Sequence, residues 1–185
     1  MPETGGGRTY RRVVRVTFRK VESGQCDWEA IRARRTRVPG CCMGGRIREG
    51  HLPHDLAGFV IESGLGLRYG FWGLIAEGAT FTSMRKRRTR EGRAVIAAHR
   101  AALDAAEARV HAEEHLLAHG GDSPLRSEWD AMVARWAALP VGAALELEWP
   151  GPSRPLASGD RRARTGRQRG SSARKPRSGP VRTRD

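Results

Sequence analysis

The sequence predicts an α+β domain, in which a small antiparallel sheet packs against three or four helices and a disordered basic tail follows. Segments with the alternating pattern of a half-buried strand stand at both ends of the apolar region, over residues 10–21 and 145–149. Segments with helical spacing lie between them. Every Trp, Tyr and Phe of the 185 residues precedes residue 150. We therefore expect a disordered N-terminus over 1–9, one domain over 10–149 and a disordered Arg-rich tail over 150–185.

The first and last strands are predicted to lie side by side. Residues 14–18 alternate apolar and polar side chains, and residues 145–149 alternate apolar side chains with glutamates. An antiparallel ladder would set these glutamates opposite Arg15 and Arg19, which carry the opposite charge. The N-terminal and C-terminal strands should therefore meet in one sheet.

The segments after the first strand are less regular. Turn-forming residues at 22–25 precede residues 26–33, which fit a returning strand with Trp28 on one face and fit a short helix nearly as well. Between 34 and 50, one Pro and four Gly interrupt regular structure. We predict a loop there, with at most a short extended piece at 36–38.

Two short helices are predicted next. Pro53 suits the first position of a helix, Asp55 favours its positive end, and apolar residues over 56–63 have helical spacing. This helix should end at the glycines of 64–66. A second helix, apolar on almost every side and therefore buried, is predicted over 71–77.

The strongest helical prediction covers residues 91–118, which are rich in Ala and precede two glycines. Ile96, Leu103, Val110 and Leu117 recur every seven residues, but polar residues at other seam positions argue against a continuous coiled coil. Packing onto the same domain is the favoured interpretation, and a homodimer through this helix is the alternative.

A last helix is predicted to begin at Pro124, with Asp122 or Ser123 as its cap. Residues 125–139 carry a clear apolar stripe, so this helix should lie on the same core.

The formal net charge of +14 is unevenly distributed along the chain. Residues 1–50 carry 12 basic and 5 acidic side chains, residues 51–150 carry 11 and 13, and residues 151–185 carry 11 and 2. Most of the excess therefore lies outside the predicted helical body. All but three of the basic residues are Arg, which a codon bias explains as well as selection for phosphate binding does.

The sequence also indicates the cellular compartment that we expect for this protein. It has no run of 18 apolar residues that could span a bilayer, and its first residues lack the apolar stretch of a secretion signal. Cys26, Cys41 and Cys42 are odd in number, and two of them are adjacent, so a disulfide framework is not expected. These features predict a protein of the reducing cytoplasm.

A metal-assisted enzyme is one functional hypothesis. His51 and His54, three residues apart beside Asp55, could converge on a metal ion, and Glu62 shares the helical face of Asp55. A metal-bound water would then be the nucleophile. Capping and loop packing explain the same residues without chemistry. His54, Asp55 and Glu62 are the catalytic candidates, and His51 and His54 are weak metal candidates.

Two further metal-site hypotheses are weaker. Cys41 and Cys42 are adjacent rather than two to four residues apart, which is the spacing of most zinc-binding cysteine pairs. Histidines also recur every four residues on the long predicted helix, where an ordinary polar face is the simpler interpretation. This second set comprises Glu107, His111, His115 and His119.

Two basic stretches could bind phosphates, namely the run over 85–90 and the tail. Neither contains aromatic residues for stacking on bases, and no zinc finger, RNP or zipper pattern accompanies them. Any nucleic-acid contact should therefore be independent of sequence and sensitive to salt. The candidate contact residues are Arg85, Lys86, Arg87, Arg88, Arg161, Arg162, Arg164, Arg167 and Arg169.

Sequence motifs for common enzyme classes are absent. We find no nucleophile elbow, phosphate-binding loop, dinucleotide-binding glycine pattern or zincin motif, and we expect no cofactor. The leading hypothesis is therefore a non-enzymatic binding or accessory protein whose basic tail contacts nucleic acid or another polyanion non-specifically. We expect no membrane partner.

A strand of the form V-x-V-x-F, followed by H-L-P-H-D-L at 51–56 and G-L-G-L-R-Y-G-F-W at 64–72, resembles small uncharacterised proteins of high-GC bacteria. The resemblance covers residues 10–83, is weaker to about 149 and excludes the tail. No activity is attached to such proteins, so the resemblance implies no function. It makes His54 and Asp55 the first residues to test.

Overall fold

Four strands form one antiparallel sheet in the order β3-β2-β1-β4, which confirms the predicted α+β class. A computed structural model describes residues 13–22, 24–32, 36–41, 50–82, 84 and 88–149. The chain divides into two units, residues 1–155 and 156–185, and every described residue belongs to the first. The segments predicted to be disordered, 1–9 and 150–185, lie outside the described residues.

The predicted pairing of the first and last strands is confirmed. β1 (Val14–Lys20) lies between β2 (Cys26–Arg32) and β4 (Ala144–Trp149). Arg15 stands opposite Glu148, as the charges predict, whereas Arg19 stands opposite an alanine. Because residues 26–32 form β2, the alternative of a short helix for this segment is wrong. The inner face of β1 carries the buried side chains of Val14, Val16 and Phe18.

The third strand corrects the loop predicted over 34–50, because residues 36–41 form β3 (Thr36–Cys41). Pro39 is tolerated since β3 is an edge strand, which needs only some of its N–H groups for the ladder. Gly40 lies against the indole of Trp28, and a Cβ at position 40 would overlap that ring. Both residues that suggested a loop therefore suit this particular place in the sheet.

The first two helices follow the prediction closely. α1 (His54–Leu65) begins one residue later than predicted, with Pro53 as its N-cap, and ends at Gly66, whose φ of 65° is left-handed. α2 (Phe71–Glu77) has the predicted bounds. The chain leaves it through Gly78, with a φ of 111°.

The long helix predicted over 91–118 is two helices, α3 (Arg90–Ala98) and α4 (Arg100–Ala118), which meet at His99. At His99 the backbone has φ −121° and ψ 19°, outside the helical range. This break adds one helix to the predicted number. No helix of the described part, α4 included, is long and apolar enough to cross a membrane.

The last helix, α5 (Arg126–Ala138), begins two residues after Pro124. The hydroxyl of Ser123 accepts a hydrogen bond from the backbone N–H of Leu125 at 3.0 Å, so Ser123 organises the turn that leads into the helix. Trp129 and Trp136, in the predicted apolar stripe, are buried.

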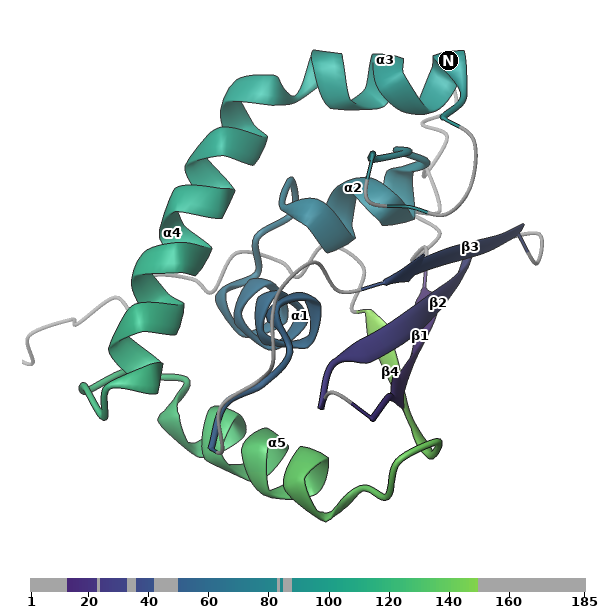
Figure 1. Ribbon diagram of the computed structural model, residues 1–185. Coiled ribbons are helices and arrows are strands. Elements are labelled where there is room, and N and C mark those ends of the chain that lie inside the picture. Colours follow the sequence, from purple (N-terminus) through teal and green to yellow (C-terminus); the bar gives the residue numbers. More distant parts are fainter. Residues whose placement is uncertain are drawn as a thin grey trace, which may run out of the picture. The chain divides into compact units, whose positions relative to one another are not determined.

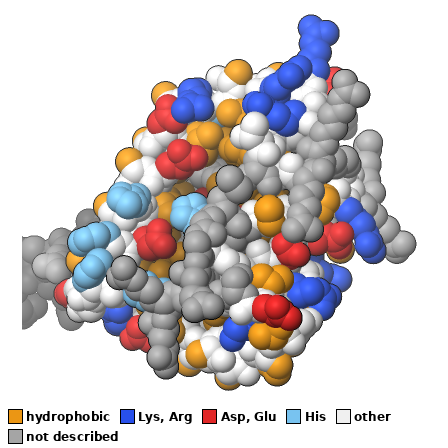
Figure 2. Space-filling model, in the orientation of Figure 1, with side chains coloured by type: hydrophobic (Ala, Val, Ile, Leu, Met, Phe, Trp, Pro, Cys, Tyr) orange, Lys and Arg blue, Asp and Glu red, His pale blue; other side chains and the backbone are white. Residues whose placement is uncertain are grey.

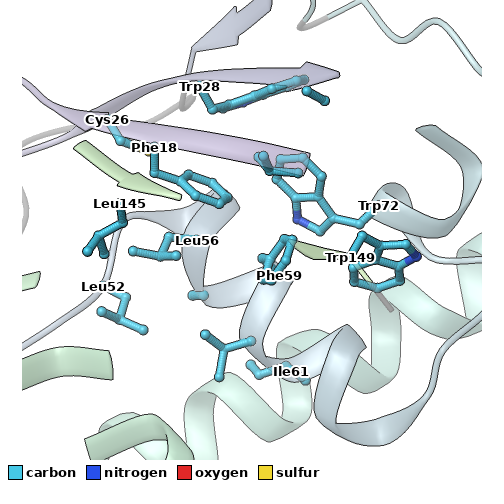
Figure 3. Packing of buried hydrophobic residues seen from close by; sticks show 14 of the residues in the cluster. Phe18, Cys26, Trp28, Leu52, Leu56, Phe59, Ile61, Trp72, Leu145 and Trp149 are labelled. Atoms are coloured by element: carbon cyan, nitrogen blue, oxygen red, sulfur yellow. The ribbon is translucent and has the colours of Figure 1, made fainter. Parts of the chain in front are cut away.

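The core lies between the inner face of the sheet and α1, which also contacts α2, α4 and α5 (Figure 1). Aromatic rings dominate it (Figure 3). Phe18, Phe59 and Trp72 meet edge to face with ring centroids 5.4–5.6 Å apart, and Trp149 packs on Phe59 in the same way. Strands and helices from both ends of the chain therefore share one core.

Candidate functional site

Both candidate acidic residues of α1 are hydrogen-bonded to Trp72, the second residue of α2, Asp55 through its backbone carbonyl and Glu62 through its carboxylate. The indole N–H of Trp72 donates to the backbone carbonyl of Asp55 at 3.0 Å, while its backbone N–H donates to Oε2 of Glu62 at 3.0 Å. The two residues are thus bonded to different ends of Trp72. The two carboxylates themselves have different partners: that of Asp55 accepts from Trp28 of β2, and that of Glu62 accepts from the start of α2.

The carboxylate of Asp55 holds the sheet to the first turn of α1. Its Oδ2 accepts a hydrogen bond from the indole Nε1 of Trp28 at 2.7 Å, and only 10% of the side chain is exposed. An acidic side chain also suits the positive end of a helix. These two structural roles are sufficient to explain why an acidic residue occupies position 55.

The carboxylate of Glu62 caps the N-terminus of α2. Its two oxygens accept hydrogen bonds from the backbone N–H groups of Phe71 and Trp72, each at 3.0 Å, and the residue is only 3% exposed. The N-cap residue, Gly70, has no side chain to satisfy these donors. A Cβ on Gly70 would overlap the carboxylate, so glycine is needed where the two groups meet.

Burial raises the pKa of Glu62 to about 8. Hydrogen bonds from the backbone N–H groups of Trp72, Phe71 and Gly73 favour the ionised form and partly oppose this shift, and the negative charge of Glu107 adds slightly to it. Such a pKa suits proton transfer near neutral pH. The oxygens are nevertheless occupied by backbone donors inside the protein, which is the arrangement of a structural cap.

His54 is the exposed member of the candidate set. Its Nδ1 lies 3.1 Å from Oδ1 of Asp55, and 70% of its side chain is exposed. A carboxylate that holds one ring nitrogen of a histidine orients the ring, as in many acid–base sites. The structure therefore brings His54 and Asp55 together, and it turns Glu62 to α2 instead.

A shared metal site does not form from these residues. Among the residues that the structure describes, no group of three or more His, Cys, Asp or Glu side chains is placed to bind a metal ion. The histidines of α4 form no such group either; the rings of His115 and His119 stack on each other with their centroids 4.2 Å apart. Cys41 is a free thiol, and Cys42 lies outside the described residues.

Most of the predicted phosphate contacts lie outside the described residues, namely Arg85, Lys86, Arg87 and those of the tail. Arg88 is described and exposed, and two further exposed arginines, Arg90 and Arg93, follow it in the first turn of α3. None of these three makes an ion pair with another described residue. Figure 2 shows blue side chains projecting beside this helix.

The apolar stripe proposed as a dimer seam is used inside the chain. Leu103 and Leu117 are buried, and Ile96 and Val110 pack against core clusters. The favoured interpretation of this helix is therefore observed. A dimer through the same stripe would require these side chains to leave the core.

Sequence reasoning missed a hollow of about 490 Å³ on the outer face of the sheet. Its charges are mixed, and some are already paired: Arg37 lies 3.8 Å from Glu29, and Arg19 donates to the carbonyl of Gly142. Alternation predicted one shared face for Thr17 and Arg19 and another for Glu146, but only the register shows that they are neighbours of Glu29 and Arg37. The lining also includes Thr17, Asp27, Ile31, Pro39 and Glu146.

Comparisons with protein-family models, with curated proteins and with solved structures found no match for this chain.

Proposed function

We propose that this protein is a non-enzymatic binding or accessory protein that associates with nucleic acid or another polyanion without reading base sequence. One observation carries the proposal: residues 151–185 hold eleven basic side chains, only two acidic ones and no aromatic residue. Each phosphate that such a segment neutralises releases counterions, which favours binding at low salt. Stacking and base-edge recognition have no residues to perform them there.

The start of α3 would extend this basic surface. Arg88, Arg90 and Arg93 are exposed and lack acidic partners among the described residues, so their charge is available to an external anion. Arg88 directly follows Arg85, Lys86 and Arg87 in the sequence, and Arg90 and Arg93 come shortly after it. The proposal therefore assigns two segments to the polyanion, with the tail as the larger contribution.

The uses found for Asp55 and Glu62 support a non-enzymatic role. Each carboxylate accepts hydrogen bonds that fasten one element to another, and Glu62 is almost completely buried. The proposal also places the protein in the reducing cytoplasm. The free thiol of Cys41 fits that location.

The test measures binding of the full chain to a fluorescent mixed-sequence duplex over a series of salt concentrations. In one variant, Arg161, Arg162, Arg164, Arg167 and Arg169 become Gln; in the matched control they become Lys, which keeps the charge. The Gln variant should bind more weakly, and its slope of log affinity against log salt should be shallower by up to about 4.5.

The Lys control should bind like the unmodified chain, because a point charge is sufficient for non-specific phosphate contact. A second duplex of unrelated sequence should give the same affinity. Equal binding by the Gln variant and the unmodified chain at low salt would remove the tail from the proposal.

The rival proposal is a small metal-assisted enzyme that uses His51, His54, Asp55 and Glu62. The contact between His54 and Asp55 favours it, since it orients an exposed imidazole. Metal analysis of the purified full chain, before and after His54→Ala, decides the matter. A stoichiometric ion lost in the variant would support the enzyme, and no ion in either protein would count against it.

A further inference from the structure

The joint between α3 and α4 contains no residue that breaks a helix. Residues 95–102 read V-I-A-A-H-R-A-A, and the only Gly or Pro between 90 and 118 is Gly92, away from the joint. The local sequence therefore favours one straight helix, yet the two helices meet at a sharp corner (Figure 1). Contacts with the rest of the protein must impose this corner.

Those contacts come from the chain before α3. The ring of His99 stacks on Tyr69 with centroids 4.3 Å apart, and its Nε2 lies 3.7 Å from Oε2 of Glu77. Gly92 lies against Thr80 so closely that a Cβ would overlap it, and the N–H of Thr80 donates to the carbonyl of Gly92 at 3.4 Å. α3 is thus fastened to the N-terminal part of the fold.

The chain after the joint is also fastened to that N-terminal part. α4 packs on α1, and Leu103 lies in a small cluster with Leu74. Lys20 of β1 donates to carbonyls at the end of α5, and β4 forms a ladder with β1 along its whole length. Residues 100–149 therefore hold the rest of the fold through contacts that do not involve the joint.

Straightening the joint would restore helical hydrogen bonds. In a continuous helix the N–H groups of Arg100, Ala101 and Ala102 donate to the carbonyls four residues earlier. At the corner these N–H groups belong to the first turn of α4, where no intrahelical partner exists. The carbonyl of Ile96 accepts instead from the N–H of His99, at 3.2 Å.

We propose that His99 is the hinge of a domain exchange between two copies of this chain. Each copy straightens residues 90–118, and its residues 100–149 pack on the N-terminal part of the other copy. Every contact across the joint is then made again between copies, and only the corner itself changes. The partner is a second copy because only that copy presents β1, α1 and α2 in the arrangement that α4 and β4 already fit.

The first experiment uses the full chain at high concentration and high salt, passed through partial unfolding and returned to buffer. Light scattering after size exclusion should show a dimer that survives dilution for hours, since release requires β4 to leave β1. His99→Ala removes the contacts with Tyr69 and Glu77 and favours helix, so it should raise the dimer fraction several-fold.

His111→Ala is the matched control, because it makes the same change on the exposed face of α4, away from the joint. It should leave the dimer fraction unchanged. Arg100→Pro should lower the dimer fraction, because proline lacks the N–H that a straight helix needs at position 100 and that the corner leaves without an intrahelical partner. A dimer fraction that is equal in all of these variants would overturn the proposal.

A second experiment identifies the exchanged strand even where His99→Ala does not fold. Thr17 and Glu146 stand opposite each other in the β1–β4 ladder. Two variants are made, one with Thr17→Cys and the other with Glu146→Cys. Both keep His99, and both also carry Cys41→Ser and Cys42→Ser. The two variants are mixed before refolding. A disulfide between the two chains forms only when β4 of one copy lies on β1 of the other.

The same two cysteines in one chain should form an internal disulfide in the monomer, which shows that the pair can react. Exchange predicts the interchain disulfide in the dimer fraction. A dimer without that disulfide, or an internal disulfide in the monomer with no interchain product after mixing, would overturn the proposal.

Discussion

Glu62 and Lys20 each cap the end of a helix to which they do not belong, one with a buried carboxyl group and the other with a partly buried ammonium group. Glu62 accepts hydrogen bonds from the N–H groups that begin α2, inside the core. Lys20 donates at 2.9 Å to the carbonyls of Trp136 and Leu139 at the end of α5, and it is only partly buried. The ionised form of each side chain suits the dipole of the helix end that it caps.

The difference in burial decides the consequence of each cap. A carboxylate removed from water loses hydration that two or three N–H groups only partly replace, so burial raises the pKa of Glu62 to about 8. The ammonium of Lys20 retains contact with solvent and also lies over the ring of Trp136, 5.7 Å from its centroid. A buried cap makes stability depend on pH, whereas a cap at the surface acts mainly through its hydrogen bonds.

The largest expected effect is the pH dependence that Glu62 introduces. Its pKa is about 8 in the folded protein and near 4.5 in the unfolded chain, so the folded state holds an extra proton between these values. Stability should therefore fall as pH rises through this window and become level above it. Each pKa unit corresponds to about 1.4 kcal/mol, so the fall amounts to a few kcal/mol.

Denaturant unfolding at several pH values, of the unmodified chain and of Glu62→Gln, measures this effect. The Gln variant should lose the slope between pH 5 and pH 8, because its side chain does not titrate. If both proteins show the same slope, Glu62 is not the source and the contrast with Lys20 fails.

Gly70→Ala tests whether the carboxylate of Glu62 needs the space that a glycine leaves at position 70. The added Cβ would overlap the carboxylate of Glu62, which its hydrogen bonds and its burial prevent from moving freely. We expect a loss of about 2 kcal/mol in unfolding free energy, within the range for overpacked sites. Thermal or denaturant unfolding measures it, and a loss below about 0.5 kcal/mol would show that the carboxylate can shift.

Lys20→Met tests the cap at the surface. The substitution keeps most of the apolar stem and removes the donors to the end of α5, so we expect a loss of about 1 kcal/mol. This loss should vary little between pH 5 and pH 8. Lys20→Arg is the matched control, because it keeps both the charge and the hydrogen-bond donors: if it is as stable as the unmodified chain, the compact shape of the ammonium is not required.

The smallest expected effect is a gain. Gly58 lies in the interior of α1, and a Cβ there would meet nothing within 4 Å. Gly58→Ala should therefore stabilise the protein by about 0.5–1 kcal/mol through helix propensity. The same unfolding measurement serves as the control for Gly70→Ala, because both variants add one methyl group to a glycine. A destabilised Gly58→Ala would mean that the helix is constrained in a way that its open surroundings do not explain.

Local patterns were sufficient for the elements whose residues interact within a few positions of each other. Alternation identified the strands that carry Phe18 and Leu145, and glycines on both sides identified α2. The pairing of β1 with β4 also followed from charge, since one arginine of β1 stands opposite Glu148. These predictions succeeded because period and composition depend on side-chain burial along one short segment.

The errors lie where a distant residue changes the meaning of a local one. Gly40 marks a loop by composition, but the indole of Trp28 occupies the space beside it and makes glycine the residue that fits a strand. His99 lies in a helix-favouring segment, but Tyr69 and Glu77 hold the chain in a corner there. The hydrogen-bond partners of Asp55 and Glu62 likewise lie on other elements, so no local pattern could identify them.

By itself the sequence determined the first and last strands, most of the helical segments, where the apolar residues end and where the positive charge gathers. These properties depend on the order of neighbouring side chains, and folding does not change them. The tertiary structure alone decided that Glu62 caps α2 rather than meeting His54, that β3 continues through Pro39, and that the helix bends at His99. Such outcomes depend on which remote groups compete for the same space and the same hydrogen bonds, and no local pattern records that competition.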